Sequence, residues 1–408
     1  MTAAWTRSAR TFLQSSVGGL PGTYWVLWLA TLVNKLGAFI VPFLSLYLVK
    51  HRGLSVSEAG ALFSLFGVGS LVANPLGGWL SDRYGRRVGM LTGLCGAAVA
   101  VLLLWLAEGR VQLAAAAFLL GLVMDLSRPS VMAIVADVVR REDQPRAYNL
   151  LYWAVNVGFA ASPLVAGSLG ERHFDWLFVG DAATTLACAA LIWRFAPESR
   201  PAPVDGMPNE GGPFVALRDA VFLPYLAVNF LVALLFFQFF VALPADMAAQ
   251  GLGEQQYGMA ISVNGVLIVL LQPMLGARVE RMRRGTALAL GALLTGAGFG
   301  LYAHVSSLAG FAAGAAVWTL GEILMAPVNS SIVADLAPEA QRARYQGAYN
   351  MAWSLAVLVG PVTGSWVLEH LGRTALWNGC LGVGAVGAVL HLLLVPSRRR
   401  RLGALARE

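Results

Sequence analysis

Long apolar runs alternate with short polar breaks from one end of the chain to the other. Each run holds about 20 residues with few charges, which is the length a helix needs to cross a lipid bilayer. Breaks rich in charges, Pro or Gly separate twelve runs, at residues 23–49, 57–80, 88–106, 110–139, 147–170, 176–195, 222–247, 254–278, 286–304, 308–336, 345–368 and 374–395. The pattern predicts an all-α polytopic membrane protein with twelve transmembrane helices.

One break is much longer than the others. Residues 196–221 are rich in Pro, Gly and acidic side chains, a composition typical of a linker. We therefore predict two six-helix halves, residues 1–195 and residues 222–408, joined by this linker and ending in a basic tail. The first run carries Lys35 at its centre and no small-residue cleavage site follows it. We expect that run to be a transmembrane helix and not a cleaved signal peptide.

The two halves repeat each other at a constant offset of 198 residues. The offset places residues 134–137 (IVAD) on residues 332–335, which have the same four letters. Matches of Pro, Gly and charged residues carry more weight than apolar matches in such a chain, and they include Gly60 with Gly258, Pro75 with Pro273, Arg86 with Arg284 and Pro163 with Pro361. A pseudo-symmetric parallel repeat of this kind is the plan of a transporter with one central site between its halves.

Composition agrees with the pattern and excludes other classes. Hydrophobic residues make up 57% of the chain and charged residues 12%, whereas soluble domains are about 25% charged. The three cysteines, Cys95, Cys188 and Cys380, fall inside apolar runs, so we expect reduced packing residues and no disulfide framework. The five histidines are scattered, and neither an H-E-x-x-H nor a C-x-x-C motif is present, so no metal site is predicted.

The positive charges lie mainly on one side of the predicted bundle. Of the 29 Lys and Arg residues, 22 lie in the loops on the side of both termini and the linker, and 5 lie in the opposite loops. The positive-inside rule therefore places both termini in the cytoplasm, and we expect a bacterial cytoplasmic (inner) membrane protein. This arrangement explains the net charge of +7 without a nucleic-acid partner. The run Arg398–Arg401 is expected to contact anionic membrane lipids.

The strongest local motif lies between the second and third runs. Residues 77–87 read GGWLSDRYGRR, and the second half carries a degenerate copy, GARVERMRR, at residues 276–284. The first motif closely resembles the signature loop of the major facilitator superfamily. With the twelve runs, the linker and the repeat, the resemblance covers essentially the whole chain. It implies the major facilitator fold, a carrier and not an enzyme, and transport by rocker-switch alternating access.

Shorter motifs resemble one branch of that family. Residues 158–167 (GFAASPLVAG) and 360–364 (GPVTG) resemble the fifth-span motif of proton-coupled drug antiporters, and residues 125–129 (DLSRP) resemble a bacterial drug-efflux branch. The resemblance implies antiport driven by protons, with no cofactor other than the proton as coupling ion.

The signature loop also predicts a cytoplasmic latch. Asp82 can face the N-terminus of span 11, where the helix dipole favours an anion, and Arg86 can reach Asp137. The second half would repeat this with Glu280 near span 5 and Arg284 near Asp335. The latch residues are Gly78, Asp82, Arg83, Gly85, Arg86, Asp137, Glu280, Arg284 and Asp335. The alternative is that these charges only set the topology.

Four ionisable residues lie near the middle of predicted spans: Lys35, Asp125, Arg128 and Glu322. The resemblance implies that their spans, 1, 4 and 10, line the central cavity. Asp125 and Arg128 are three residues apart, so they could pair on one helix face. Glu322 has no cation within a helical turn and could be matched across the cavity by Lys35. Because a desolvated carboxylate is protonated more easily than one in water, Glu322 is the first candidate for proton coupling and Asp125 the second. Asp181 is expected to bind a neighbouring helix.

Polar and aromatic side chains on the inner spans predict the substrate cavity. The candidate cavity residues are Lys35, Arg128, Asn34, Phe39, Tyr152, Trp153, Phe236, Gln238, Trp318, Asn329 and Trp353. A wall of rings and amides suits amphipathic organic molecules. For each ring, packing or contact with lipid is an alternative role.

Three functions are compatible with these features. The first is proton-coupled efflux of amphipathic drug-like or metabolite substrates. The second is a proton symporter that imports a small organic anion gripped by Lys35 and Arg128. The third is a non-transporting receptor or scaffold on the same fold. For the first, which we favour, the expected partners are a small-molecule substrate and membrane lipids, and the expected state is monomeric.

Overall fold

The computed structural model describes residues 18–198, 215–338 and 341–405, and this part of the chain is almost entirely helical. The N-terminal half contains α2 (Gly22–Leu36), α3 (Ile40–Leu46), the π-helical turn η1 (Tyr47–His51), α4 (Val56–Tyr84), α5 (Arg86–Leu106), α6 (Arg110–Met124), α7 (Arg128–Val138), α8 (Gln144–His173) and α9 (Asp175–Phe195). The C-terminal half contains η2 (Val215–Arg218), α10 (Phe222–Phe236), η3 (Phe237–Phe239), α11 (Ala242–Ala249), α12 (Glu254–Arg281), α13 (Arg284–Leu301), η4 (Tyr302–His304), α14 (Leu308–Leu336), α15 (Arg342–Leu371), α16 (Arg373–Leu393) and α17 (Val395–Leu405).

Helices occupy all twelve predicted runs. Eleven helical segments in the described residues are long and apolar enough to cross a membrane. The remaining run forms α13, which begins at Arg284, is rich in glycine and packs between α14 and α16. The helix α17 continues beyond the last predicted run and carries the Arg398–Arg401 cluster. The all-α fold class predicted from the sequence is therefore confirmed.

The first span is interrupted, and polar side chains satisfy the exposed backbone there. The helix α2 ends at Leu36 and α3 begins at Ile40. The Asp181 carboxylate of α9 accepts hydrogen bonds from the backbone N–H groups of Phe39 and Ile40, at 3.0 Å each. Since unsatisfied backbone groups are costly inside a membrane, this contact explains why a buried carboxylate lies off the cavity. The expectation that Asp181 binds a neighbouring helix is confirmed.

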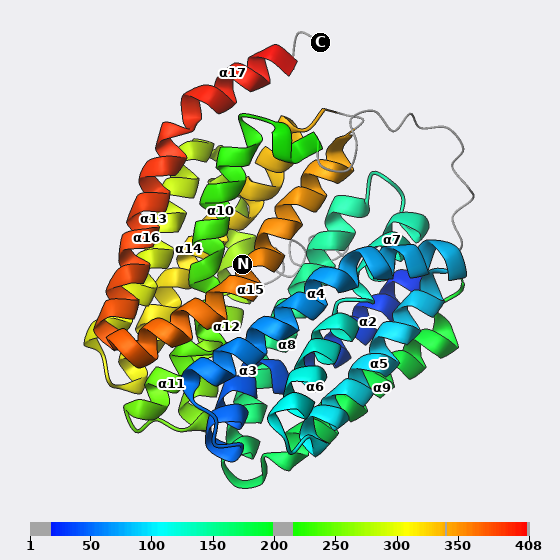
Figure 1. Ribbon diagram of the computed structural model, residues 1–408. Helices are drawn as coiled ribbons and strands as arrows, with labels where there is room; N and C mark the ends of the chain where they lie inside the picture. The colour runs from blue at the N-terminus through cyan, green and yellow to red at the C-terminus, as the bar shows by residue number, and fades with distance from the viewer. Residues whose placement is uncertain (1–17, 199–214, 339–340, 406–408) are drawn as a thin grey trace, which may run out of the picture.

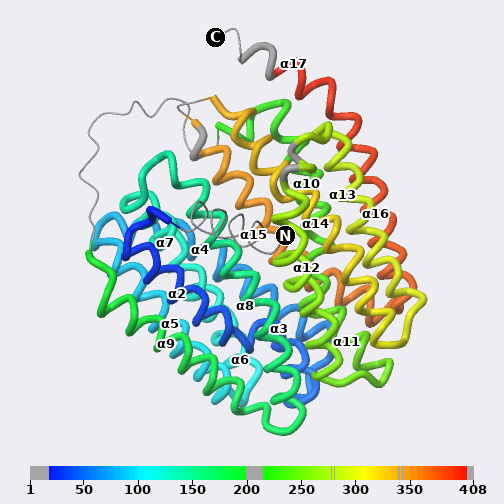
Figure 2. Tube along the Cα trace, turned by 180° about the vertical axis from the view of Figure 1, so that it is seen from behind, coloured from blue at the N-terminus to red at the C-terminus, as the bar shows by residue number. Residues whose placement is uncertain are grey.

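The two halves meet along two symmetry-related helix pairs. The helix α4 packs on α15, and α12 packs on α8. Both contacts are close because glycines face the partner backbone: Gly60 and Gly67 lie against α15, and Gly258 and Gly265 lie against α8. The two pairs of glycines are 198 residues apart. Figure 1 shows α2–α9 gathered on one side and α10–α16 on the other, and Figure 2 shows the same division from behind.

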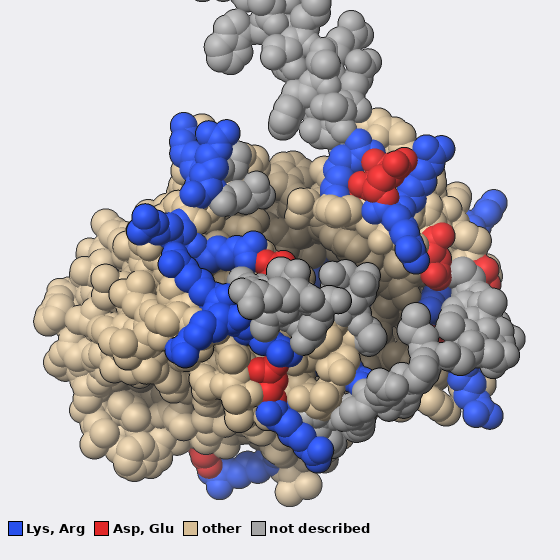
Figure 3. Space-filling model, turned by 90° about the horizontal axis from the view of Figure 1, so that it is seen from above, with Lys and Arg blue, Asp and Glu red and all other residues tan. Residues whose placement is uncertain are grey.

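We call the face that carries the loops around Gly85 and residues 139–143 the basic face, and its counterpart near residues 52–55 and 250–253 the opposite face. The halves are joined at the opposite face by an ion pair between Lys50 and Glu254 (2.9 Å) and by a hydrogen bond from the Ser57 N–H to Glu369 (2.6 Å). Figure 3 looks onto the basic face, where a hollow opens between the halves and Lys and Arg gather around it.

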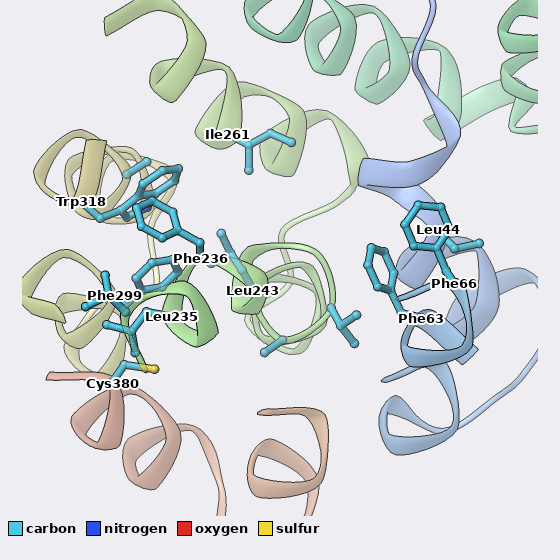
Figure 4. Close-up of a cluster of buried hydrophobic side chains, with 14 of the residues drawn as sticks. Leu44, Phe63, Phe66, Leu235, Phe236, Leu243, Ile261, Phe299, Trp318 and Cys380 are labelled. Atoms are coloured by element: carbon cyan, nitrogen blue, oxygen red, sulfur yellow. The ribbon is translucent and has the colours of Figure 1, made fainter. Parts of the chain in front are cut away.

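The buried core consists of two clusters, one shared by the two halves and one within the N-terminal half. The larger cluster crosses between the halves; Figure 4 shows Phe63 and Phe66 of α4 on one side and Phe236 and Trp318 on the other, with Leu243 between them. A second cluster, around Tyr24 and Ile134, belongs to the N-terminal half alone. The halves are thus closed together at the opposite face and separated at the basic face.

Candidate transport site

Glu322 is held by a neutral hydrogen-bond donor. It lies in the middle of α14 and is half-buried. The Asn264 side-chain amide of α12 donates to the Glu322 carboxylate at 2.8 Å and to the Thr319 hydroxyl at 3.1 Å. No Lys or Arg forms an ion pair with Glu322 among the described residues. A carboxylate with amide and hydroxyl neighbours can gain or lose a proton without breaking an ion pair.

Asp125 has a similar environment in the N-terminal half. The Ser70 hydroxyl of α4 donates a hydrogen bond to its carboxylate. No ion pair forms between the Asp125 and Arg128 side chains in the described residues, so the predicted pair was wrong. The reason is local: α6 ends at Met124 and α7 begins at Arg128, so the chain turns between the two side chains and they do not share a helix face.

The two carboxylates occupy nearly equivalent places in the repeat. Asp125 and Glu322 are 197 residues apart, one less than the repeat offset. Each is on the fourth span of its half, and each is bonded to the second span, α4 or α12, by an uncharged side chain. The duplication has therefore kept the position of a carboxylate while its hydrogen-bond partner has changed from Ser to Asn.

The two mid-span cations lie on the side of Asp125. Lys35 is within electrostatic range of Asp125, Arg128 and Asp181. It forms no ion pair in the described residues, and the proposed match with Glu322 is not made. Tyr152 of α8, in the N-terminal half, lies within electrostatic range of Glu322. Arg128 is exposed at the start of α7.

Aromatic rings accompany these groups. Tyr152 and Trp153 are 37% and 38% exposed, and Trp153 stacks on Trp28 with ring centroids 6.5 Å apart. On the other half, Trp353 of α15 packs on Phe236 with centroids 5.7 Å apart. Phe236 itself is buried, so Trp353 is the more accessible member of that pair.

Two other candidate cavity residues of the N-terminal half point elsewhere in this structure. The Asn34 amide donates to the Thr185 hydroxyl of α9 at 3.2 Å. The Phe39 ring is buried against Gly180, also on α9. Both residues hold span 1 against α9, and the Phe39 ring is buried there. The sequence could not separate these roles because both faces of an inner helix carry polar and aromatic residues.

Three candidates of the C-terminal half are also buried. Gln238 donates to the Gly360 carbonyl at 3.0 Å, at the break in span 7. Asn329 accepts from the Tyr225 hydroxyl at 2.7 Å. The Trp318 indole N–H donates to the Tyr302 hydroxyl at 3.0 Å. With polar groups engaged inside the half, these residues shape the helices around the hollow and are not presented to it in this conformation.

The signature loop forms a compact charged cluster at the basic face. Arg86 bonds the Asp82 carboxylate and the Ser81 hydroxyl and lies 3.5 Å from Asp137. Arg83 lies over the Trp79 ring. The expected contact between Arg86 and Asp137 is present. Asp82 is largely exposed beside Arg86.

Glycine and a linker carboxylate fix the turn of this loop. Gly85 has a φ of +110°, a conformation that residues with a Cβ rarely adopt. A Cβ there would also lie 2.2 Å from Glu198, whose carboxylate accepts the N–H of Arg87 at 3.1 Å. Gly78 faces open space. No pattern along the chain indicated Glu198, which lies at the start of the predicted linker.

The second copy of the loop contains the expected ion pair between Arg284 and Asp335. The side chain of Glu280 lies outside the described residues, so its expected contact with span 5 stays a prediction. Sequence reasoning also missed the cross-half pair Lys50–Glu254, because both residues lie at span ends that carry no recognisable motif.

Mutation of the loop aspartate tests whether the cluster takes part in transport. Asp82→Asn is expected to leave folding nearly unchanged, because an exposed ion pair contributes about 0–1 kcal/mol. We expect transport to fall several-fold, since the mutation biases the equilibrium between the conformation closed at the basic face and the one closed at the opposite face. Purified protein would be compared by thermal unfolding and by flux in proteoliposomes. Full flux in this variant would show that the charges only set topology.

Two helical halves around a hollow with mid-membrane carboxylates define a polytopic membrane carrier. The model of the Major Facilitator Superfamily matches residues 27–245 and 225–408. The chain belongs to the major facilitator superfamily, and it is an integral membrane transporter and not an enzyme.

Similar curated proteins are transporters of this kind. The Na(+), Li(+), K(+)/H(+) antiporter of Planococcus maritimus is 23% identical, with 83% of this chain and 90% of that protein covered. Multidrug resistance protein MdtH of Aeromonas salmonicida is 24% identical, with 91% of this chain and 94% of that protein covered. The class C tetracycline resistance protein of Escherichia coli is 26% identical, with 86% of this chain and 89% of that protein covered.

Solved structures confirm the fold. The nucleoside transporter NupG matches with a TM-score of 0.80 at 13% identity, covering 92% of this chain and all of that one (100%). A POT family transporter bound to 5-aminolevulinic acid matches with a TM-score of 0.79 at 16% identity, covering 94% and 98%.

Proposed function

We propose that this carrier exports amphipathic organic compounds in exchange for protons, by rocker-switch alternating access. The observation that carries the proposal is Glu322, a mid-membrane carboxylate whose side-chain hydrogen bond within the described part of the chain comes from the neutral Asn264. Carboxylates inside membrane spans mark ion pathways and proton relays. The second carboxylate, Asp125, has the same kind of neutral partner and is the second candidate.

Partly exposed rings on the helices where the halves meet support an amphipathic substrate. Tyr152 and Trp153 are partly exposed on α8, and Trp353 lies on α15. Tyr152 also lies within electrostatic range of the Glu322 carboxylate. Binding of substrate beside the Tyr152 ring can therefore be coupled to protonation of Glu322. Relatives with multidrug and tetracycline resistance names favour export.

Import of an organic anion is the second candidate. Lys35 and Arg128 form no ion pair within the described residues, and Arg128 is exposed. Two cations that are free of ion pairs in the described residues could hold a carboxylate. In that case substrate and proton would move in the same direction.

Transport in proteoliposomes with an imposed pH gradient separates the two. An exporter moves a dye or drug against the direction of proton flow, and an importer moves an organic acid with the protons. A panel of cationic dyes and small organic acids covers both arms. If no compound in the panel shows proton-dependent flux, the result would favour a receptor or scaffold role.

We also propose that the basic face is cytoplasmic and that the membrane is a bacterial inner membrane. Most Lys and Arg of the loops lie on this face (Figure 3), which is the arrangement that the positive-inside rule predicts for a cytoplasmic side. The hollow would then open to the cytoplasm, where an exporter collects its substrate.

Cysteine labelling tests this orientation. In a variant lacking Cys95, Cys188 and Cys380, single cysteines replace Glu142 on the basic face or Glu108 on the opposite face; both residues are exposed. In intact cells, a membrane-impermeant maleimide should label the Glu108→Cys variant and not the Glu142→Cys variant. The reverse pattern would overturn the orientation.

A further inference from the structure

A second cavity lies at the basic face of the C-terminal half, among α13, α14, α16 and α17. Its volume is about 500 Å³. Four arginines line it, Arg283, Arg284, Arg398 and Arg399, together with an apolar wall that includes Ile332 and Val395. None of these residues belongs to the carboxylate site between the halves.

The cavity retains a large positive charge. Arg284 is paired with Asp335, which is also on the wall. The other three arginines have no ion pair among the described residues. Together these three cations attract an anion. The low dielectric around the buried Arg398 strengthens its part of that attraction, whereas Arg283 and Arg399 are exposed at the rim.

Arg398 supplies a buried donor that lacks a partner. The residue is 5% exposed. Its Nη2 donates to the His391 carbonyl at 2.7 Å and its Nε to the Leu394 carbonyl at 3.3 Å. Its Nη1 is buried and has no hydrogen-bond acceptor among the residues that the structure describes. A buried cationic donor without an acceptor is costly, and the oxygen of an anionic ligand would satisfy it.

The position of α17 over the cavity is fixed by a second contact. Arg401 lies 3.7 Å from the Asp219 carboxylate, which accepts from the Tyr345 hydroxyl at 2.7 Å. Burial alone would raise the pKa of Asp219, but the hydrogen bonds from Tyr345, Phe222 and Val221 and the charge of Arg401 lower it. Asp219 is therefore ionised at neutral pH and holds the basic helix in place.

The apolar side of the cavity continues onto the membrane-facing surface. Leu392 lines the cavity and is 50% exposed, and the adjacent Leu393 is 67% exposed. A ligand with a phosphate and a hydrocarbon chain could place the phosphate on the arginines and the chain along these leucines. Free phosphate shares the first contact only.

We propose that this cavity binds the headgroup of an anionic phospholipid from the leaflet at the basic face. The phosphate accepts hydrogen bonds from Arg398 and from Arg283 or Arg399, and an acyl chain follows Ile332 and Leu392. Arginine is suited to this task because its planar fork recognises phosphate oxygens.

The test measures lipid retained by the purified full-length protein in detergent, by native mass spectrometry. The probes are phosphatidylglycerol, phosphatidylcholine and inorganic phosphate. Arg398→Gln removes the buried donor, and Arg283→Gln removes a cation from the exposed rim without disturbing the interior. Arg400→Gln is the matched control, since Arg400 belongs to the same basic run, is exposed and does not line the cavity.

We expect wild type and Arg400→Gln to retain phosphatidylglycerol in preference to phosphatidylcholine. Arg398→Gln and Arg283→Gln should each weaken that binding by about tenfold or more, because hydrogen bonds to charged groups are among the strongest. Equal weakening by Arg400→Gln would reduce the effect to diffuse attraction and overturn the proposal. Displacement of the lipid by inorganic phosphate at equal concentration would assign the cavity to a free anion instead.

Discussion

Replacing Glu322 with Gln is expected to abolish proton-driven uphill transport while downhill exchange of substrate survives. Glutamine keeps the shape of the side chain and can still accept the hydrogen bond of Asn264, which is 2.8 Å from the carboxylate. It cannot exchange a proton. Each pH unit supplies about 1.4 kcal/mol per proton, and 100 mV supplies about 2.3 kcal/mol more. Without a group that carries the proton, neither the pH gradient nor the membrane potential acting on that proton can drive the substrate gradient.

The measurement is substrate accumulation in proteoliposomes with and without a pH gradient. With one pH unit and one proton exchanged, wild type should sustain about a tenfold substrate gradient, and Glu322→Gln should approach equal concentrations. Downhill exchange in the same vesicles controls for folding and for substrate binding.

Asp125→Asn separates the two candidate carboxylates. Asn can still accept a hydrogen bond from Ser70. We expect this variant to pump more than Glu322→Gln does. If Asp125→Asn fails and Glu322→Gln pumps normally, the roles are exchanged. Normal pumping by both variants would disprove this account of coupling.

The fold was accessible from the sequence because its signals are long. Runs of apolar residues, the 198-residue repeat and the loop at residues 77–87 each extend over many positions, so local errors do not change the result. The interruption of span 1 was not predicted, because it depends on Asp181, a side chain more than a hundred residues away.

The candidate site was only partly accessible. Asp125 and Glu322 were found because a charge inside a span is rare. Their partners, Ser70 and Asn264, are common polar residues, and only the packing of α6 on α4 and of α14 on α12 identifies them. The sequence predicts the span but not the direction of the side chain for Phe39, Gln238, Trp318 and Asn329. In a helix that is apolar all round, no periodicity distinguishes the cavity face from the packed face.

The repeat leads to a prediction about the conformational change itself. Gly60 lies against the Pro361 carbonyl, and its equivalent Gly258 lies against the Pro163 carbonyl. A Cβ at Gly258 would be 2.1 Å from the Pro163 oxygen, and a Cβ at Gly60 would be 2.8 Å from the Pro361 oxygen. The two proline oxygens are backbone atoms of the other half, which cannot move aside as the end of a flexible side chain can. At Gly60 the Cβ would also lie 1.9 Å from the Ser365 Oγ.

Gly258→Ala and Gly60→Ala are therefore expected to disfavour the conformation in which the opposite face is closed. Overpacking costs about 1–3 kcal/mol, and a cost confined to one of two states shifts their ratio by about 5- to 150-fold. Transport should fall strongly, and a cysteine placed on α12 near the contact should become more reactive from the opposite face. Gly276→Ala, on the same helix as Gly258, is the matched control, because a Cβ there meets no atom of the described residues within 4 Å. If both interface variants transport at the wild-type rate, the two halves do not separate along these helices, and the conformational change must follow another path.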